Sequence, residues 1–164
     1  MEPIFIHLPE KKLVGVGAKF ISILSPDKNN MNVIPNLWHQ FMSRSGTIPN
    51  KVGQVSYGLV ECLPEAAGGK SHKDELFYVA CTEVSEISSI PSGMIHRTIP
   101  AGRYAKFTHM GKLEGLGNTM NFIYKAWLPK SGVELRDGPH IEWYDNRFNL
   151  RSDQSEFDIL LPVH

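Results

Sequence analysis

The strongest constraint on the fold is an order of secondary-structure signals that occurs twice along the chain. Residues 32–43 and 116–128 both have the apolar spacing of an amphipathic helix, and each segment contains one tryptophan, Trp38 and Trp127. A strand-like run precedes each helix and two strand-like runs follow it, so the chain reads β–α–β–β twice and divides near residues 90–93. This order predicts an α+β domain with one antiparallel sheet, both helices on one side and a groove between the halves.

The ends of these elements follow from local chemistry. Leu37 and Phe41 lie four residues apart in the first helix, and Pro129 is expected to end the second one. The Pro-, Gly- and Lys-rich segment 63–74 is expected to be the exposed loop of a hairpin. The expected strands are residues 13–24, 55–62, 75–84, 94–98, 103–109, 140–144 and 156–163.

Composition indicates one ordinary globular domain that does not bind nucleic acid. The chain has 164 residues, a formal net charge of zero and a charged fraction of 21%. Nucleic-acid-binding domains usually carry a basic excess, which is not found here. The two cysteines, Cys62 and Cys81, do not form a CxxC motif, and their apolar surroundings predict reduced core thiols. Reduced thiols fit a cytoplasmic protein.

We expect neither membrane association nor a cofactor. The N-terminal residues 1–12 carry charges and prolines instead of a signal peptide, and no apolar run reaches the roughly 18 residues that span a bilayer. The seven histidines form neither HxxxH nor a Cys/His cluster, so neither a metal site nor an axial haem ligand is indicated. No P-loop, GxGxxG or GxSxG motif is present.

The second half of the chain contains several blocks in a characteristic order. These are PAGRYA followed by a phenylalanine, then YKAWLPKSG, DGP with IEWYD, and the terminal FDILLPV, while IPNLWHQF and VSYGLV match more loosely in the first half. In these blocks the chain resembles the GyrI-like family, which includes effector-binding domains of AraC-type and MerR-type multidrug regulators. The resemblance implies a single domain over residues 1–164 built from tandem βαββ repeats (two SHS2 modules), about 1–90 and 91–164. It also implies a central cleft for hydrophobic, often cationic compounds.

The resemblance implies one acidic residue in the cleft, and Glu142 occupies the matching position. Strand alternation places Glu142 and Tyr144 on one face of their strand, and Ile141 and Trp143 on the other. A carboxylate is costly to bury alone, so a buried Glu142 would need a partner or a cationic ligand. The alternative is a solvent-facing glutamate on an edge strand.

Aromatic side chains are the other candidate ligand contacts, because their faces attract flat apolar compounds and cations. Tyr57 and Trp127 are the first candidates since they lie in the family blocks, and Trp38 follows. Tyr104 and Phe107 are also candidates, although alternation allows at most one of them to face the cleft. For each of these residues the alternative is ordinary core packing.

Three functions fit these observations. The first is binding of a small hydrophobic, cationic compound for sensing or sequestration. The second is cofactor-free hydrolysis of a reactive small molecule, with Glu142 as general base and Tyr57 or Trp127 positioning the substrate; the sequence shows no second catalytic group, so binding without turnover is preferred. The third is inhibition of a protein partner, by analogy with gyrase-directed relatives. We expect a stand-alone module that does not contact DNA, because the chain leaves no residues for a helix-turn-helix domain.

Overall fold

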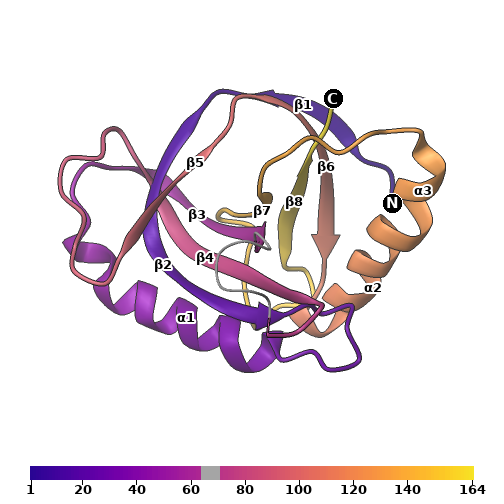
Figure 1. Ribbon diagram of the computed structural model, residues 1–164, viewed down its shortest axis with the longest axis horizontal. Helices are drawn as coiled ribbons and strands as arrows, with labels where there is room; N and C mark the ends of the chain where they lie inside the picture. Colours follow the sequence, from indigo (N-terminus) through magenta and orange to yellow (C-terminus); the bar gives the residue numbers. More distant parts are fainter. Residues whose placement is uncertain (64–70) are drawn as a thin grey trace.

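The computed structural model describes residues 1–63 and 71–164, which form a curled antiparallel sheet with two helical regions outside it (Figure 1). The first helical region is α1 (Asn30–Arg44), and the second runs through α2 (Leu116–Asn121), a π-helical segment (Phe122–Trp127) and α3 (Leu128–Ser131). This arrangement confirms the predicted α+β class. The strands are β1 (Ile4–Leu8), β2 (Lys11–Ile21), β3 (Lys51–Cys62), β4 (Glu75–Val84), β5 (Ile95–Ile99), β6 (Gly102–Met110), β7 (His140–Tyr144) and β8 (Glu156–Pro162).

The strand order is symmetric about the centre of the sheet. It runs β1-β6-β8-β7-β3-β4-β2-β5, and exchanging β1–β4 with β5–β8 turns this order into its own reverse. Strands β3 and β7 meet in the middle, while the short strand β1 pairs with β6 and the short strand β5 pairs with β2. The division into two SHS2-type repeats at about residue 90 stays a prediction, which this symmetry supports.

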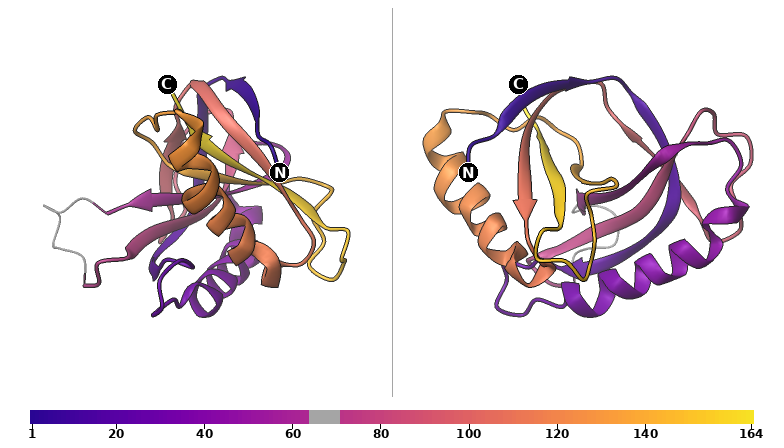
Figure 2. Two further views of the ribbon diagram at one scale, coloured as in Figure 1. Left: turned by 90° about the vertical axis from the view of Figure 1, so that its right-hand side faces the viewer. Right: turned by 180° about the vertical axis from the view of Figure 1, so that it is seen from behind.

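The two faces of the sheet hold different cores because side chains alternate along each strand. Both helical regions lie along the outside of the curl, as the views from the side and from behind show (Figure 2). Under them, the outer face carries one apolar cluster around Leu37 and Phe41 of α1 and another around Ile123 of the second region. The inner core contains Leu13, Tyr57, Leu59, Val79, Cys81, Ile99, Tyr104, Ile141 and Leu160.

Two local predictions were wrong. The sequence predicted no strand before residue 13, but residues 4–8 form β1, a short apolar run (IFIHL) between Pro3 and Pro9. The second helical region does not end at Pro129 but continues to Ser131, where Gly132 adopts a left-handed conformation with φ of 67°. Pro129 is tolerated because it lies in the first turn of α3, where its missing N–H is not needed.

Most of the hairpin loop predicted for residues 63–74 lies outside the described residues, although β3 and β4 on either side do pair as a hairpin. None of the helices in residues 1–63 and 71–164 has the length and apolar character needed to cross a bilayer. The same residues contain no group of three or more His, Cys, Asp or Glu side chains placed to hold a metal ion.

Candidate functional site

A cleft lies on the outer face of the sheet, between α1 and the second helical region. It consists of two adjoining cavities, a large lobe of about 560 Å³ and a small lobe of about 240 Å³. Both lobes are lined by Asn30 and Ile34 of α1, Leu116 of α2 and Glu142 of β7. The large lobe falls in the range of roughly 300–1,000 Å³ that is usual for small-molecule sites.

Apolar and aromatic side chains make up most of the large lobe. The rings of Trp38 and Tyr144 meet edge to face with centroids 5.5 Å apart, and Phe148 meets Tyr144 at 4.7 Å. Offset and edge-to-face contacts of this kind hold aromatic walls in fixed orientations. At the rim, Met42 and Leu150 are 62% and 66% exposed, so the lobe opens through an apolar mouth.

Glu142 lies at the centre of the sheet. It occupies β7, which pairs with β3 on one side and β8 on the other, and only 8% of its surface is exposed. The alternative of a solvent-facing glutamate on an edge strand is therefore wrong. Glu142 and Tyr144 share the outer face, while Ile141 and Trp143 face the inner core, as alternation predicted.

Two phenol groups hold the carboxylate. The Tyr78 hydroxyl donates a hydrogen bond to Oε2 of Glu142 at 2.5 Å, and the Tyr144 hydroxyl donates to the same oxygen at 2.9 Å. Tyr78 in turn accepts a hydrogen bond from Nε1 of Trp38 at 3.0 Å. The chain Trp38–Tyr78–Glu142 therefore links α1, β4 and β7 across the floor of the cleft.

Burial and these hydrogen bonds act in opposite directions on the pKa of Glu142. Burial disfavours the charged form and raises the pKa, whereas the bonds from Tyr78 and Tyr144 lower it; burial has the larger effect, so the net shift is upward. Burial, together with the neighbouring Glu142 charge, also raises the pKa of both tyrosines well above 10.0. The phenols consequently stay protonated and remain donors at neutral pH.

The carboxylate has no basic partner within the described part of the chain. Salt bridges form elsewhere among these residues, for example between Arg147 and Asp158 at 2.7 Å, but none includes Glu142. A buried charge without an opposite charge is unfavourable unless something else supplies one. The cleft therefore holds a desolvated acidic group without an opposite charge among the described residues.

Gly58 makes room for this arrangement. It lies directly opposite Glu142 in the β3–β7 ladder and opposite Ala80 in the β3–β4 ladder. A Cβ atom at position 58 would lie 2.0 Å from the Tyr78 hydroxyl and 2.8 Å from Oε2 of Glu142. Only glycine lets the Tyr78 side chain cross β3 and reach the carboxylate.

Of the sequence-predicted site residues, Glu142 and Trp38 lie together in the cleft, and Tyr57 and Tyr104 lie elsewhere. Tyr57 faces the inner core, where its hydroxyl donates to Glu83 at 3.3 Å and its ring meets Trp143 at 5.0 Å. Tyr104 also lies in the inner core and donates to the carbonyl of Pro100 at 2.7 Å. Neither residue lines the two lobes.

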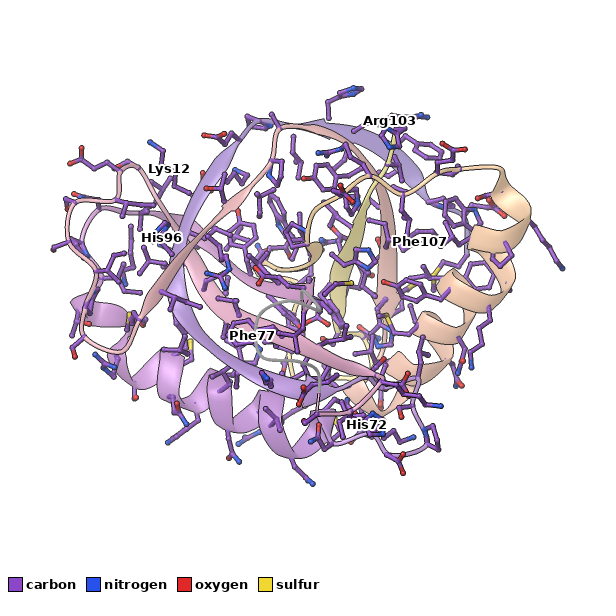
Figure 3. The ribbon with its side chains drawn as sticks, viewed as in Figure 1. Lys12, His72, Phe77, His96, Arg103 and Phe107 are labelled. Atoms are coloured by element: carbon purple, nitrogen blue, oxygen red, sulfur yellow. The ribbon has the colours of Figure 1, made fainter. Side chains whose placement is uncertain are left out.

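Phe107 and Trp127 pack against each other under the second helical region and line neither lobe. Their ring centroids are 4.9 Å apart, and Phe107 is fully buried. Phe107 lies on the side of β6 that faces this helical region (Figure 3). Tyr104 and Phe107 do occupy opposite faces of β6, as alternation predicted.

Sequence patterns did not identify Gly58, and they did not place the aromatic side chain of Tyr78 beside Glu142. Tyr78 reaches Glu142 from β4, across the intervening strand β3, and this contact depends on a strand register that one sequence does not reveal. Tyr144 could have been selected, because it lies two positions from Glu142 on the same face of β7.

The small lobe contains a second polar pair on the other side of Glu142 from Trp38. Tyr124 of the π-helical segment and Nδ1 of His140 on β7 are hydrogen-bonded, and their rings stack with centroids 5.6 Å apart. Burial lowers the pKa of His140 to about 4 and raises that of Tyr124, so both groups are neutral at pH 7. The thiol of Cys62 also lines this lobe and is exposed, so the prediction of a core thiol is right for Cys81 and wrong for Cys62.

The fold and cleft define an α+β domain whose central cavity has the size and lining of a small-molecule site. The whole chain, residues 1–164, matches the family described as the GyrI-like small molecule binding domain. The chain belongs to this family, and the predicted resemblance is confirmed.

Two relatives of known name are transcriptional regulators. The chain is 34% identical to the transcriptional regulator BrlR of Pseudomonas aeruginosa over 135 residues, which are 81% of this chain and 47% of BrlR. It is 25% identical to the transcriptional regulator Rob of Salmonella typhimurium over 166 residues, which are 97% of this chain and 55% of Rob. The chain therefore spans about half the length of these regulators.

Solved structures share the fold at low sequence identity. SAV2435 bound to tetraphenylphosphonium superposes with a TM-score of 0.71 at 15% identity, covering 100% of this chain and 94% of that chain. The C-terminal domain of EcmrR superposes with a TM-score of 0.68 at 17% identity, covering 99% of this chain and 97% of that chain.

Proposed function

We propose that the cleft binds a lipophilic organic cation, whose apolar groups fill the large lobe and whose charge pairs with Glu142. The observation that carries this proposal is the position of Glu142: a carboxylate 8% exposed at the base of an aromatic cavity, bonded to two phenols. The same cavity would therefore select a ligand both by its apolar surface and by its positive charge.

The binding energy has two sources. Transfer of apolar ligand surface from water contributes roughly 25 cal/mol per Å², and the faces of Trp38, Tyr144 and Phe148 add cation–π attraction of about 0.5–2 kcal/mol each. The Glu142 carboxylate is already desolvated in the empty cleft, so part of the cost of forming the ion pair is met by folding. The tetraphenylphosphonium held by SAV2435 is a compound of this class.

The biological role that we propose is sensing. BrlR and Rob are transcriptional regulators, and this chain matches about half of each. A cation bound to Glu142 would keep the carboxylate ionised and so preserve the charged acceptor of the Trp38–Tyr78–Glu142 chain, which joins elements of both halves. Sequestration of toxic cations uses the same chemistry and needs no partner.

The test is a calorimetric titration of wild type and Glu142→Gln with a matched pair of probes, methyltriphenylphosphonium and neutral triphenylphosphine oxide. Glutamine keeps the size of the side chain and removes its charge. The cation should lose roughly 10–100-fold in affinity, because hydrogen bonds and pairs with charged groups contribute about 1.5–3 kcal/mol. The neutral probe should change by less than about threefold, since its contacts are apolar.

Equal losses of affinity for both probes would show that residue 142 affects the shape of the cavity and does not recognise the charge of the ligand. Mass spectrometry of the recovered ligands separates binding from hydrolysis. Recovery of an unchanged ester-bearing cation supports a binding protein, whereas its conversion by wild type but not by Glu142→Gln would assign the carboxylate a catalytic role.

A further inference from the structure

The small lobe is too small to be an independent site for a drug-sized molecule. Its volume of about 240 Å³ lies below the roughly 300–1,000 Å³ of ordinary ligand pockets. It shares Asn30, Ile34, Leu116 and Glu142 with the large lobe, so the two form one continuous cleft with Glu142 between them. A ligand whose charge lies at Glu142 can extend into both.

The small lobe offers hydrogen-bonding groups that have no partner among residues 1–63 and 71–164. Tyr124 and His140 share one hydrogen bond, and in the neutral pair either the phenol or the imidazole donates it. Whichever donates, the pair retains a second N–H or O–H, for which residues 1–63 and 71–164 supply no acceptor. One donor of this pair is therefore free to bind a ligand.

Asn30 provides a second unused group. Its residue is 6% exposed, it lines both lobes, and its side-chain amide has no hydrogen-bond partner among the described residues. Its neighbour Asn29 differs, because its Oδ1 accepts a bond from the N–H of Ile21 at 2.7 Å. Among the described residues, the only fully enclosed side-chain nitrogen or oxygen without a partner is Nη2 of Arg136, so the amide of Asn30 is open to the cleft and can exchange water for a ligand.

The charge of the lobe limits what it can accept. Glu142 and Glu61 both line it, and the only partner of Glu61 in the described chain is Arg97, at 2.7 Å. A carboxylate or phosphate would be repelled by Glu142. An uncharged group that both accepts and donates hydrogen bonds, such as an amide or an alcohol, fits these partners.

We propose that the small lobe is a second subsite, in which Asn30 and the Tyr124–His140 pair bind a short uncharged polar arm of the same ligand. This inference rests on the proposed function and narrows its ligand class. The preferred ligand is an asymmetric lipophilic cation that carries an amide or alcohol a few bonds from the charge. A cation with only apolar substituents uses the large lobe alone.

The experiment compares butyltriphenylphosphonium with (3-carbamoylpropyl)triphenylphosphonium, which differ only at the end of the arm. Wild type should bind the amide-bearing cation about five- to tenfold more tightly, a difference on the scale of one good hydrogen bond. Asn30→Leu and His140→Phe should each reduce this ratio to about 1; because the ratio is taken within one variant, any change in the contacts common to both cations cancels. Tyr124→Phe provides a further variant that keeps the ring stacking.

Two exposed residues of the same types, an asparagine and a histidine, serve as matched controls. Asn36→Leu replaces an exposed asparagine of α1, and His96→Phe replaces an exposed histidine of β5, labelled in Figure 3; neither residue lines the cleft. Both controls should keep the wild-type ratio. The reaction of Cys62 with a thiol reagent reports where the arm lies, because this thiol lines the small lobe and Cys81 is buried.

The amide-bearing cation should slow the labelling of Cys62. Equal affinity for the two cations, with ratios unchanged in Asn30→Leu and His140→Phe, would overturn the subsite and leave the cation cleft standing. A preference for the amide with no protection of Cys62 would place the arm elsewhere and would also overturn it. If neither cation binds wild type, the proposed function itself fails.

Discussion

Tyr78 and Glu142 are 64 positions apart in the sequence and come from different halves of the chain, yet the phenol of one donates to the carboxylate of the other at 2.5 Å. They lie on β4 and β7, with β3 between them, and the phenol passes over the backbone of Gly58. The carboxylate therefore has its orientation fixed by a neutral donor, which leaves its charge available to a ligand.

The first prediction concerns Gly58. Gly58→Ala should destabilise the fold by about 1–3 kcal/mol and weaken cation binding, because the new methyl group would overlap the Tyr78 hydroxyl. Urea denaturation and calorimetry measure the two effects. Gly46→Ala is the control, since nothing lies within 4 Å of a Cβ there. Partial recovery in the double variant Gly58→Ala/Tyr78→Phe would confirm the cause, and an unchanged affinity in Gly58→Ala would contradict it.

The second prediction concerns pH. Burial raises the pKa of Glu142 above 4.5, so in the empty cleft this residue stays protonated up to a higher pH than an exposed glutamate does. Affinity for tetraphenylphosphonium should rise by up to about tenfold per pH unit below the raised pKa and level off above it. Calorimetry between pH 4 and 8 shows this curve. The same slope in Glu142→Gln would assign the effect to another group.

The contribution of Glu142 to the stability of the empty protein should fall as pH rises, whereas the affinity for the cation rises. The folded state binds the Glu142 proton more tightly than the unfolded state, so this residue contributes a loss of stability as pH rises from 4.5 through its folded pKa. Denaturation midpoints of wild type should fall across this window relative to those of Glu142→Gln. Parallel curves for the two proteins would mean that the carboxylate is not desolvated.

The third prediction separates cleft aromatics from core aromatics. Trp38→Phe removes the indole donor to Tyr78 and should weaken cation binding about tenfold. Tyr57→Phe removes a hydroxyl that contacts Glu83 on the inner face and should leave affinity unchanged. Phe107→Ala should cost about 3–5 kcal/mol of stability, because it empties a fully buried site. A loss of affinity in folded Tyr57→Phe would argue against the cleft.

The fourth prediction concerns His140. Its pKa is lowered from 6.5 to about 4 by burial, so nitrogen-15 NMR should show a neutral imidazole from pH 8 down to about pH 5. The unfolded chain takes up this proton first as pH falls below 6.5, and stability from this residue is therefore lost between 6.5 and 4. His140→Phe should lack this component. Titration near 6.5 would show that the small lobe is hydrated.

Local patterns predicted the order of strands and helices, and alternation placed Glu142 and Tyr144 on one face, because both depend on near neighbours in sequence. The residues that contact Glu142 were harder to predict from the sequence. Tyr57 and Gly58 are adjacent, but only the register of β3 against β7 shows that the glycine faces Glu142 while the tyrosine faces away. That register, and the π-helical turn that carries Trp127 onto Phe107, arise from long-range packing.

The pairing of β1 with β6 and of β5 with β2 has a consequence for how this chain can be divided. Each half completes the sheet of the other, so neither half, expressed alone, retains a partner for its outermost strand. The two halves are interlocked through these outer strands and do not form two separate sheets. Such a molecule should melt in a single cooperative transition, and fragments cut near residue 90 should regain structure only when mixed.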